Sequence, residues 1–262
     1  MNFVKKVFIR FRAKLILLNN SIQISNSRKK LKKLRNIHKG ERCFIIGNGP
    51  SLDIKDLEKL KGEICFGTHR IYEIFDKTEW RPNYYCAQDH KLISSSVKSI
   101  NQIDANNRFI GTVIGQRYKG LKGVTYVKLD TRKFYPELPE FSEDISSGVF
   151  EGFTVSYMCF QIAAHMGFSE IYLLGIDHNY SKVKLADGTV LEDSKVQDHF
   201  SEKDLIENLP QLFKSTLAYE KAKAYGEANG IKIFNATRGG KLEVFERVDF
   251  DLIFENMKKG LE

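Results

Sequence analysis

Short apolar runs alternate with longer stretches of helical periodicity from residue 42 onward. Apolar residues at consecutive positions are typical of strands that are covered on both faces, as in parallel sheets. These runs predict strands at Cys43–Ile46, Ile64–Gly67, Tyr84–Ala87, Phe109–Val113, Val124–Leu129, Ile171–Ile176 and Ile231–Phe234. Helices are predicted between them, at Ile54–Leu60, Arg70–Phe75, His90–Ile100, Gly152–Met166 and Leu209–Asn229.

This alternation predicts an α/β fold, with a Rossmann-like, mostly parallel sheet and helices on both faces. No internal repeat and no long Gly/Ser linker interrupts residues 42–250. A chain of 262 residues can bury one sizeable core. We therefore expect a single Rossmann-like domain over residues 41–262, preceded by a distinct leader over residues 1–40.

The leader has the pattern of an amphipathic helix. Its apolar residues share one face of a helical wheel and are flanked by basic residues; they are Phe3, Val4, Val7, Phe8, Phe11, Leu15 and Leu18. No apolar stretch approaches the ~20 residues that span a bilayer, and no cleavage site for a signal peptide follows. We predict that this helix lies in the membrane interface. The alternative is that it packs on the protein's own body or on a partner subunit.

The charge distribution supports the membrane interpretation. Twelve of the 41 Lys and Arg residues lie in the first forty positions, which contain no Asp or Glu. The cluster Arg28–Arg35 extends the basic region, so residues 3–35 are predicted to bind an anionic membrane, at about 1 kcal/mol per basic group near the surface. Residues 41–262 carry 29 basic and 33 acidic groups, which disfavours nucleic acid as a partner.

The four cysteines are far apart and form no Cys-x-x-Cys pair, which is typical of a protein from a reduced compartment. Together with the leader, this predicts a cytoplasmic protein that is peripheral to the inner face of the cell membrane. The sequence leaves the oligomeric state open.

Small and polar residues follow several of the predicted strands. Ligands of open α/β sheets bind beyond the carboxyl ends of the strands, so these residues are predicted to line one site. The candidates are Gly47, Asn48, Gly49, Ser51, His69, Arg70, Gln88, Asp89, Asp177 and Tyr180.

The turn Gly47–Ser51 has the properties of a phosphate-binding loop. Its glycines let the backbone approach a ligand, and Ser51 is placed to cap the next helix, whose first N–H groups attract anions. The turn lacks both the Gly-x-Gly-x-x-Gly spacing of dinucleotide folds and the Gly-Lys-Ser/Thr of a P-loop. A second loop, with Asp144, Ser146, Ser147 and Gly148 ahead of Thr154, either lines a sugar or phosphate site or supplies only helix caps.

The six histidines fall into two groups. His38 lies in the leader and His165 within a core helix, so both are interpreted as structural. The other four are predicted in loops and are candidates for proton transfer or ligand contact; they are His69, His90, His178 and His199. Their spacing matches no zinc signature, so no metal site is predicted.

Several motifs, in order along the chain, resemble known families. They are Ile45–Leu52, Phe66–Tyr72, Ser147–Val149, Gly167–Asp177, Asp198–Phe200 and Asn235–Thr237. Over roughly residues 42–250 the chain resembles the MptE-like family, which is named for 6-hydroxymethylpterin diphosphokinase and includes the bacterial motility accessory factors. It also resembles the related bacterial sialyltransferases of glycosyltransferase family 42.

The resemblance to the sialyltransferases implies site residues. It places Asn48, Gly49, Ser51, Ser147 and Gly148 at the nucleotide of a CMP-linked donor, and His199 as the base that deprotonates the acceptor hydroxyl. We expect His199, Asp177 and Tyr180 to form the catalytic group, and Ser146 to join the nucleotide site. That scheme requires no metal or other cofactor. The chain has His69 where those sialyltransferases have asparagine, which leaves the donor sugar open.

Two enzymatic functions follow from the resemblance. The first is a membrane-peripheral glycosyltransferase that uses a nucleotide-activated sugar, CMP-linked and sialic-acid-like or another ulosonic acid, to extend a surface glycan or lipid-linked acceptor. The second is a pterin-type diphosphokinase that transfers pyrophosphate from ATP, with Mg²⁺ bridged by Asp89, Asp144 and Asp177. A non-catalytic nucleotide- or glycan-binding module is the third hypothesis.

Overall fold

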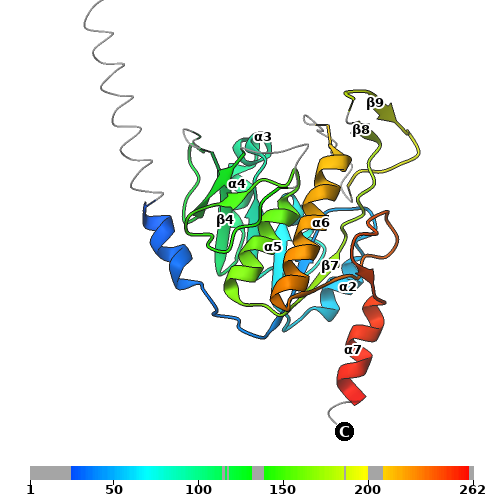
Figure 1. Cartoon of the computed structure of the whole chain (residues 1–262), viewed down its shortest axis with the longest axis horizontal. Coiled ribbons are helices and arrows are strands. Elements are labelled where there is room, and N and C mark those ends of the chain that lie inside the picture. The colour runs from blue at the N-terminus through cyan, green and yellow to red at the C-terminus, as the bar shows by residue number, and fades with distance from the viewer. Residues whose placement is uncertain are drawn as a thin grey trace, which may run out of the picture.

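The computed structural model describes residues 25–113, 116, 118–131, 139–185, 187–199 and 209–259. Its centre is a nine-stranded sheet in the order β11-β10-β7-β1-β2-β3-β4-β5-β6, with every neighbouring pair parallel (Figure 1). The strands are β1 (Arg42–Ile46), β2 (Cys65–Thr68), β3 (Tyr84–Ala87), β4 (Asn107–Thr112), β5 (Thr125–Asp130), β6 (Val149–Phe150), β7 (Glu170–Leu174), β10 (Lys232–Asn235) and β11 (Glu246–Arg247). The predicted Rossmann-like parallel sheet is confirmed.

Helices cover both faces of the sheet. They are α2 (Ile54–Lys59), the 3-10 turn η1 (Ile71–Ile74), α3 (His90–Ser95), α4 (Val97–Gln102), α5 (Val155–Met166), α6 (Leu212–Asn229) and α7 (Phe250–Lys259). Residues from α5, α6 and a helix over residues 25–33 share one hydrophobic core with the sheet. Residues from α2, η1, α3, α4 and α7 share the other.

The strand β1 explains why consecutive apolar positions predict this architecture. Cys43 and Ile45 belong to the core under α5, whereas Phe44 and Ile46 belong to the core under α2. All four side chains are fully buried. Because successive side chains of a strand point to opposite faces, a strand with helices on both sides needs apolar residues at every position.

Some elements differ from their predicted form. The helix predicted over His90–Ile100 is divided into α3 and α4 at Ser96, whose N–H donates to Leu92 O and Ile93 O and ends the first helix. The helix predicted over Arg70–Phe75 is only the 3-10 turn η1. The elements β6, β11 and α7 were not predicted, and neither was the antiparallel ribbon β8 (Lys182–Lys184) and β9 (Val190–Glu192). The ribbon is mostly exposed, so it has no buried apolar run to reveal it.

The helix α5 ends where the sequence predicts and begins three residues later. Thr154 caps its start by accepting a hydrogen bond from Ser156 N, and Gly167 ends it in the left-handed conformation at φ 91°. Glycine adopts this conformation without the steric cost that other residues meet. The strand β7 follows directly, so this helix and strand form one compact unit.

The described part of the leader packs on the body. Leu31 is 2% exposed and belongs to the core under α5. Ser27 Oγ accepts a 3.0 Å hydrogen bond from Tyr126 N, at the edge of β5. On the other side, Asn36 N donates to His165 O and His165 Nε2 lies 3.1 Å from Leu31 O. Residues 25–40 are therefore part of the folded domain.

The predicted amphipathic segment, residues 3–18, lies outside the described residues. Within the described ranges, no helix combines the length and the apolar character that crossing a membrane requires.

The chain order of the strands creates a switch point in the sheet. From β1 the chain adds strands on one side as far as β6, and then returns to place β7 on the other side of β1. The chain consequently leaves β1 for α2 on one face of the sheet and leaves β7 for α6 on the other face, which is the arrangement at which open α/β sheets bind ligands beyond the carboxyl ends of their strands.

Candidate active site

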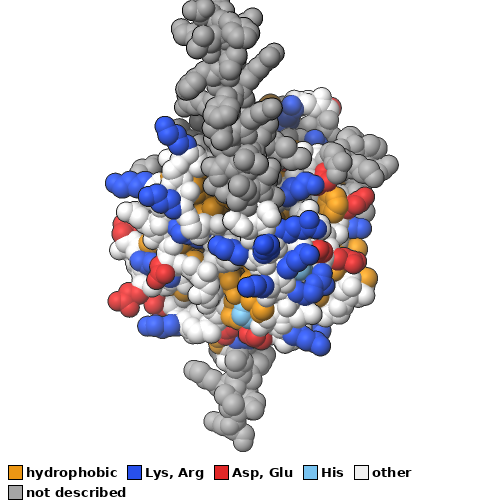
Figure 2. All heavy atoms as spheres, turned by 90° about the vertical axis from the view of Figure 1, so that its left-hand side faces the viewer, with side chains coloured by type: hydrophobic (Ala, Val, Ile, Leu, Met, Phe, Trp, Pro, Cys, Tyr) orange, Lys and Arg blue, Asp and Glu red, His pale blue; other side chains and the backbone are white. Residues whose placement is uncertain are grey.

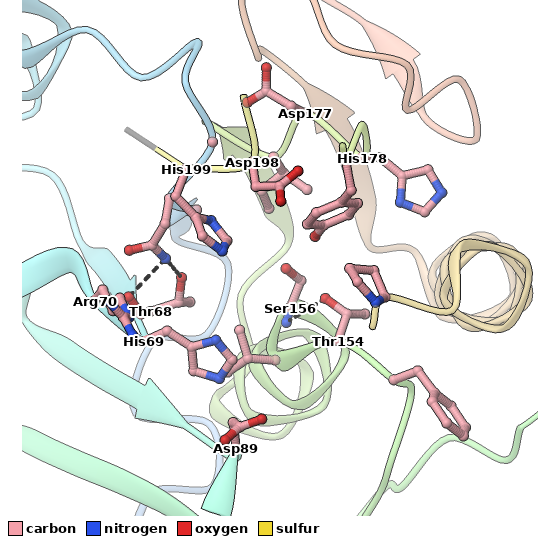
Figure 3. A pocket seen from close by; sticks show the side chains of 18 of the residues that line it. Thr68, His69, Arg70, Asp89, Thr154, Ser156, Asp177, His178, Asp198 and His199 are labelled. Carbon is pink, nitrogen blue, oxygen red and sulfur yellow. Dashed lines mark hydrogen bonds between the residues drawn. The ribbon is translucent and has the colours of Figure 1, made fainter. Parts of the chain in front are cut away.

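A cavity of about 730 Å³ opens at this switch point (Figure 3). Its lining comes from the loops after β1, β2, β3 and β7, from the start of α5 and from the segment before α6. The structure thus brings together most of the predicted candidates; those in the lining are Gly47, Asn48, Gly49, His69, Arg70, Gln88, Asp89, Asp177, His178, Tyr180 and His199.

The loop after β7 leaves no room for side chains at the two glycines of the Gly47–Ser51 turn. A Cβ atom on Gly49 would lie 1.7 Å from Asp177 Oδ2, and one on Gly47 would lie 2.2 Å from Gly175 O. Ser51 Oγ donates a 2.7 Å hydrogen bond to Asp177 Oδ2. The loop after β7 is therefore packed directly against the turn after β1, and Asp177 holds the two together.

The expected cap of the following helix is wrong. Asp53, not Ser51, caps α2 by accepting a 2.9 Å hydrogen bond from Lys55 N. A carboxylate thus occupies the start of this short helix, where an anion was expected to bind, and the helix carries a further acidic residue, Asp56, in its first turn. Negative side chains at a helix start stabilise the helix but repel a phosphate.

Asn48 ties the turn to the end of β2. Its Nδ2 donates to both Thr68 O and Thr68 Oγ1, at 3.0 Å each (Figure 3). Thr68 Oγ1 in turn donates a 2.8 Å hydrogen bond to Ile46 O. Asn48 therefore has a structural role besides lining the cavity.

His69 presents its imidazole to the cavity from a constrained backbone. Its φ is 42°, in the left-handed region, and its carbonyl accepts a 2.6 Å hydrogen bond from Tyr85 OH. Gln88 N donates to His69 Nε2 at 3.5 Å. Burial lowers the pKa of His69 to about 4, so the ring is neutral at pH 7.

Backbone strain is concentrated at the cavity. Four non-glycine residues in the described ranges have positive φ, and three of them line the cavity: His69, Phe153 and His178. Residues in this conformation persist only where the surrounding structure fixes them, and they are enriched at functional sites. The side chain of His178 is fixed by a 2.9 Å contact between its Nε2 and Thr216 Oγ1, and burial lowers its pKa to about 4.

The segment between β7 and α6 brings His199 to the same cavity. Asp198 Oδ2 accepts a 2.8 Å hydrogen bond from Ser181 Oγ, which joins the two ends of the ribbon segment. The rings of Tyr180 and His199 meet edge to face with centroids 6.4 Å apart. His199 also lowers the pKa of His69 electrostatically, and Figure 3 shows both rings on the same side of the cavity.

The two remaining members of the expected catalytic group are both largely buried. Burial raises the pKa of Asp177 and that of Tyr180. The Asp177 carboxylate is already hydrogen-bonded to Ser51, which makes it a residue that positions the turn.

Ser146, Ser147 and Gly148 are not among the residues that line the cavity. The hydroxyls of Ser146 and Ser147 donate to Asp144 Oδ2, at 2.9 and 3.3 Å. The Asp144 carboxylate thus closes this loop on itself, and the structure does not bring these residues to the other candidates.

The first residues of α5, and not the loop of Ser146–Gly148, form this wall of the cavity. Thr154, Val155 and Ser156 line the cavity, and Thr154 Oγ1 lies 3.2 Å from the hydroxyl of Tyr219 on α6. Thr154 is the helix cap, as one of the two interpretations predicted. Its helix contains twelve residues, and its first backbone N–H groups carry partial positive charge at this wall.

Three charged residues of the lining were missed by the sequence analysis, namely Lys91, Glu151 and Lys184, and a fourth, Asp198, was recognised only as part of a family motif. Lys184 lies on β8, which has no sequence signal. Glu151 could have been found from its place beside Gly152 and Thr154, in a loop that enters a predicted helix. Burial raises the pKa of Glu151, against the opposing effect of Lys214.

The three carboxylates expected to hold Mg²⁺ do not come together. Asp89 and Asp177 line the cavity, but Asp144 does not. Asp89 Oδ1 accepts a 2.8 Å hydrogen bond from Leu92 N and caps α3. In the ranges that the structure describes, no group of three His, Cys, Asp or Glu side chains is arranged to hold a metal ion. The residues present do not fit that magnesium site.

Comparison with known proteins identifies a related family. A family model described as 6-hydroxymethylpterin diphosphokinase MptE-like matches residues 17–183, which is more than half of the chain. No curated protein sequence matches the chain. A diphosphokinase is a transferase, so the family description indicates group transfer as the class of chemistry. The match includes β1 to β7 and therefore most of the strand ends that form the cavity.

Proposed function

Because the chain belongs to the MptE-like family, we propose that it is a glycosyltransferase that uses a CMP-linked donor, sialic-acid-like or carrying another ulosonic acid. The acceptor is a surface glycan or a lipid-linked sugar. The observation that carries the proposal is the shared cavity of His199 and the Gly47–Gly49 turn at the switch point of the sheet. Switch points are where open α/β sheets bind nucleotides.

The volume of the cavity is that of a ligand pocket. Pockets for single small molecules range from about 300 to 1,000 Å³, and this cavity of about 730 Å³ lies in the upper part of that range. Its walls come from both sides of the switch point, so a nucleotide and an acceptor sugar can enter from different sides.

In the proposed reaction, His199 accepts the proton of the acceptor hydroxyl as that oxygen attacks the anomeric carbon of the donor. The new carbon–oxygen bond forms while the bond from that carbon to the phosphate oxygen breaks, and CMP leaves with the electron pair. Loop N–H groups and hydroxyls at the cavity stabilise the negative charge that develops on the departing phosphate. Asp177 positions the turn that contacts the nucleotide.

Diphosphate transfer from ATP is the second candidate, favoured by the description of the family. The two candidates differ in their demand for metal, since ATP reactions use Mg²⁺ to bridge the phosphates. The predicted carboxylate set for that ion is not assembled, because Asp144 is bound to Ser146 and Ser147 outside the cavity lining. Sugar transfer therefore fits the side chains at the cavity better.

Thermal-shift measurements separate the two candidates. Sugar transfer predicts stabilisation by CMP without metal, because binding to the native state raises the unfolding temperature. Diphosphate transfer predicts a response to ATP that depends strictly on Mg²⁺, and that result would overturn the first candidate. CDP and UDP serve as controls for the base and for the number of phosphates.

We also propose that the enzyme acts at an anionic membrane. Figure 2 shows Lys and Arg side chains gathered on the face that carries the helix of residues 25–33. The exposed basic residues of this helix and the turn after it are Arg28, Lys29, Lys30, Lys32, Lys33 and Arg35. Because Leu31 is fixed in the core, this basic surface is held rigidly against the domain.

Vesicle sedimentation tests the membrane proposal. Deletion of residues 2–20 should reduce the fraction of the protein that sediments with vesicles that contain phosphatidylserine, while leaving the thermal unfolding temperature unchanged. A deletion variant that sediments as completely as the wild-type protein would refute an anchor in the leader.

A further inference from the structure

Among the described residues, four carboxyl groups line the cavity, and three of them bind the protein's own backbone or loops. Asp89 caps α3, Asp177 is hydrogen-bonded to the turn after β1, and Asp198 is hydrogen-bonded to the residue before β8. Each of these carboxylates therefore already fixes the structure of the site.

The fourth carboxyl, that of Glu151, is different. Within the described residues it accepts no hydrogen bond and takes part in no ion pair, although it is half-buried. Burial raises the pKa of Glu151 and the charge of Lys214 opposes this; the Lys214 ammonium lies 4.5 Å from the centroid of the Phe153 ring. Its oxygens are not among the described side-chain atoms that are buried without a partner, so water reaches them at the cavity wall; a ligand that displaces this water has to donate hydrogen bonds in its place.

The backbone around Glu151 is firmly fixed. Glu151 N donates a 3.0 Å hydrogen bond to Asp130 O at the end of β5. A Cβ atom at Gly152 would lie 2.4 Å from the Cβ of Tyr157, and Phe153 is held at φ 52°. The backbone on both sides of Glu151 is thus fixed by its contacts. The positive φ of Phe153 costs free energy, and such conformations are common in segments that present a functional group.

We propose that Glu151 binds the acceptor, with its carboxyl accepting hydrogen bonds from hydroxyl groups of a neutral sugar. The sugar lies at the end of the cavity next to the first turn of α6, where Pro210 and Gln211 also contribute to the lining. A carboxylate repels phosphate and sugar-acid groups, so this end suits a neutral sugar better than it suits the anionic donor. This inference rests on the proposed sugar transfer, because it assigns the acceptor side of the same cavity.

The test is saturation-transfer-difference NMR with the methyl glycosides of galactose, glucose and N-acetylglucosamine, each measured with and without CMP. We expect at least one glycoside to bind the wild-type protein. Glu151→Ala should weaken it about tenfold, which corresponds to the loss of about one hydrogen bond to a charged group. Glu151→Gln keeps an acceptor oxygen and should stay within about threefold of wild type.

Two controls distinguish the loss of a contact with the glycoside from general damage to the fold. Glu79→Ala removes an exposed carboxyl that is not in the cavity lining and should change nothing. CMP affinity, measured by calorimetry, should be equal in wild type and in both Glu151 variants. Glycoside binding that is the same in Glu151→Ala and wild type, or the binding of CMP but of no glycoside, overturns the inference and leaves the proposed donor site standing. A wild-type protein that does not bind CMP overturns the proposed sugar transfer itself.

Discussion

Asp198 is joined to Ser181 by hydrogen bonds from both the backbone N–H and the hydroxyl of the serine. Ser181 directly precedes β8 and Asp198 follows β9, so their hydrogen bonds close the segment that contains the β8–β9 ribbon into a loop. Its closure places His199, the next residue, at the cavity beside Tyr180. The position of the candidate base therefore depends on a contact that is not part of the sheet.

Asp198→Ala should lower kcat about 100-fold under the proposed function, because the loop that positions His199 loses both hydrogen bonds. Ser181→Ala keeps the backbone N–H and should lower kcat less than tenfold. CMP affinity should change less than threefold in both variants, as calorimetry would measure. An Asp198→Ala enzyme with the same kcat as wild type would show that the hydrogen bonds between Ser181 and Asp198 do not position the base.

His199→Ala should reduce kcat at least 100-fold, which is the lower range for loss of a general base. Calorimetric CMP affinity should stay within a few-fold of wild type, since the base contacts the acceptor. His178→Ala is the matched control, because His178 lines the same cavity but its Nε2 is already in contact with Thr216. Unaltered turnover in the His199 variant would remove this residue from the role of base.

Gly49→Ala should destabilise the protein by about 1–3 kcal/mol, the usual cost of forcing extra atoms into a packed site. The added Cβ would overlap Asp177 Oδ2 and break the hydrogen bond from Ser51. Urea unfolding gives the free energy, and Pro50→Ala, at the exposed neighbouring position, is the control. Equal unfolding midpoints for Gly49→Ala and Pro50→Ala would contradict the close packing of the two loops.

The stability of the protein should fall as the pH falls from about 6.5 towards 4. In the unfolded chain His178 takes up a proton near pH 6.5, whereas in the folded protein burial lowers its pKa to about 4. The unfolded state thus binds more protons in this window, which lowers the free energy of unfolding by up to about 1 kcal/mol per pH unit. Urea unfolding at pH 7, 6 and 5 gives the free energy of unfolding, which should fall less steeply with pH in His178→Gln than in the wild-type protein. The same pH dependence in both proteins would contradict the burial of this ring.

Leu31→Ala should cost about 2–5 kcal/mol, the range for large-to-small changes in a core. The side chain is 2% exposed and packs in the core under α5. Lys30→Ala, its exposed neighbour, should change the free energy of unfolding by less than about 0.5 kcal/mol. Two variants of equal stability would mean that residues 25–40 are not part of the cooperative domain.

The parallel sheet was predictable because its strands are buried on both faces. Consecutive apolar residues such as Phe44 and Ile45 can be satisfied only between two layers of helices. The gathering of His69, Gln88 and Asp177 at one rim followed from the same pattern, because residues after parallel strands share one edge of the sheet. The family could also be identified from the sequence, through motifs such as Ile45–Leu52 and Gly167–Asp177.

The sequence by itself determined the layers, the direction of the strands and the edge at which polar residues meet, because periodicity and burial are local properties of the chain. Only the tertiary structure decided which polar groups remain available to a ligand. Asp144 binds its own loop, Asp177 binds the turn after β1, and Glu151 is left without a donor among the described residues. Hydrogen bonds make this selection, and the one between Ser51 and Asp177 joins residues that are far apart in the sequence, so residue type or spacing alone does not encode it.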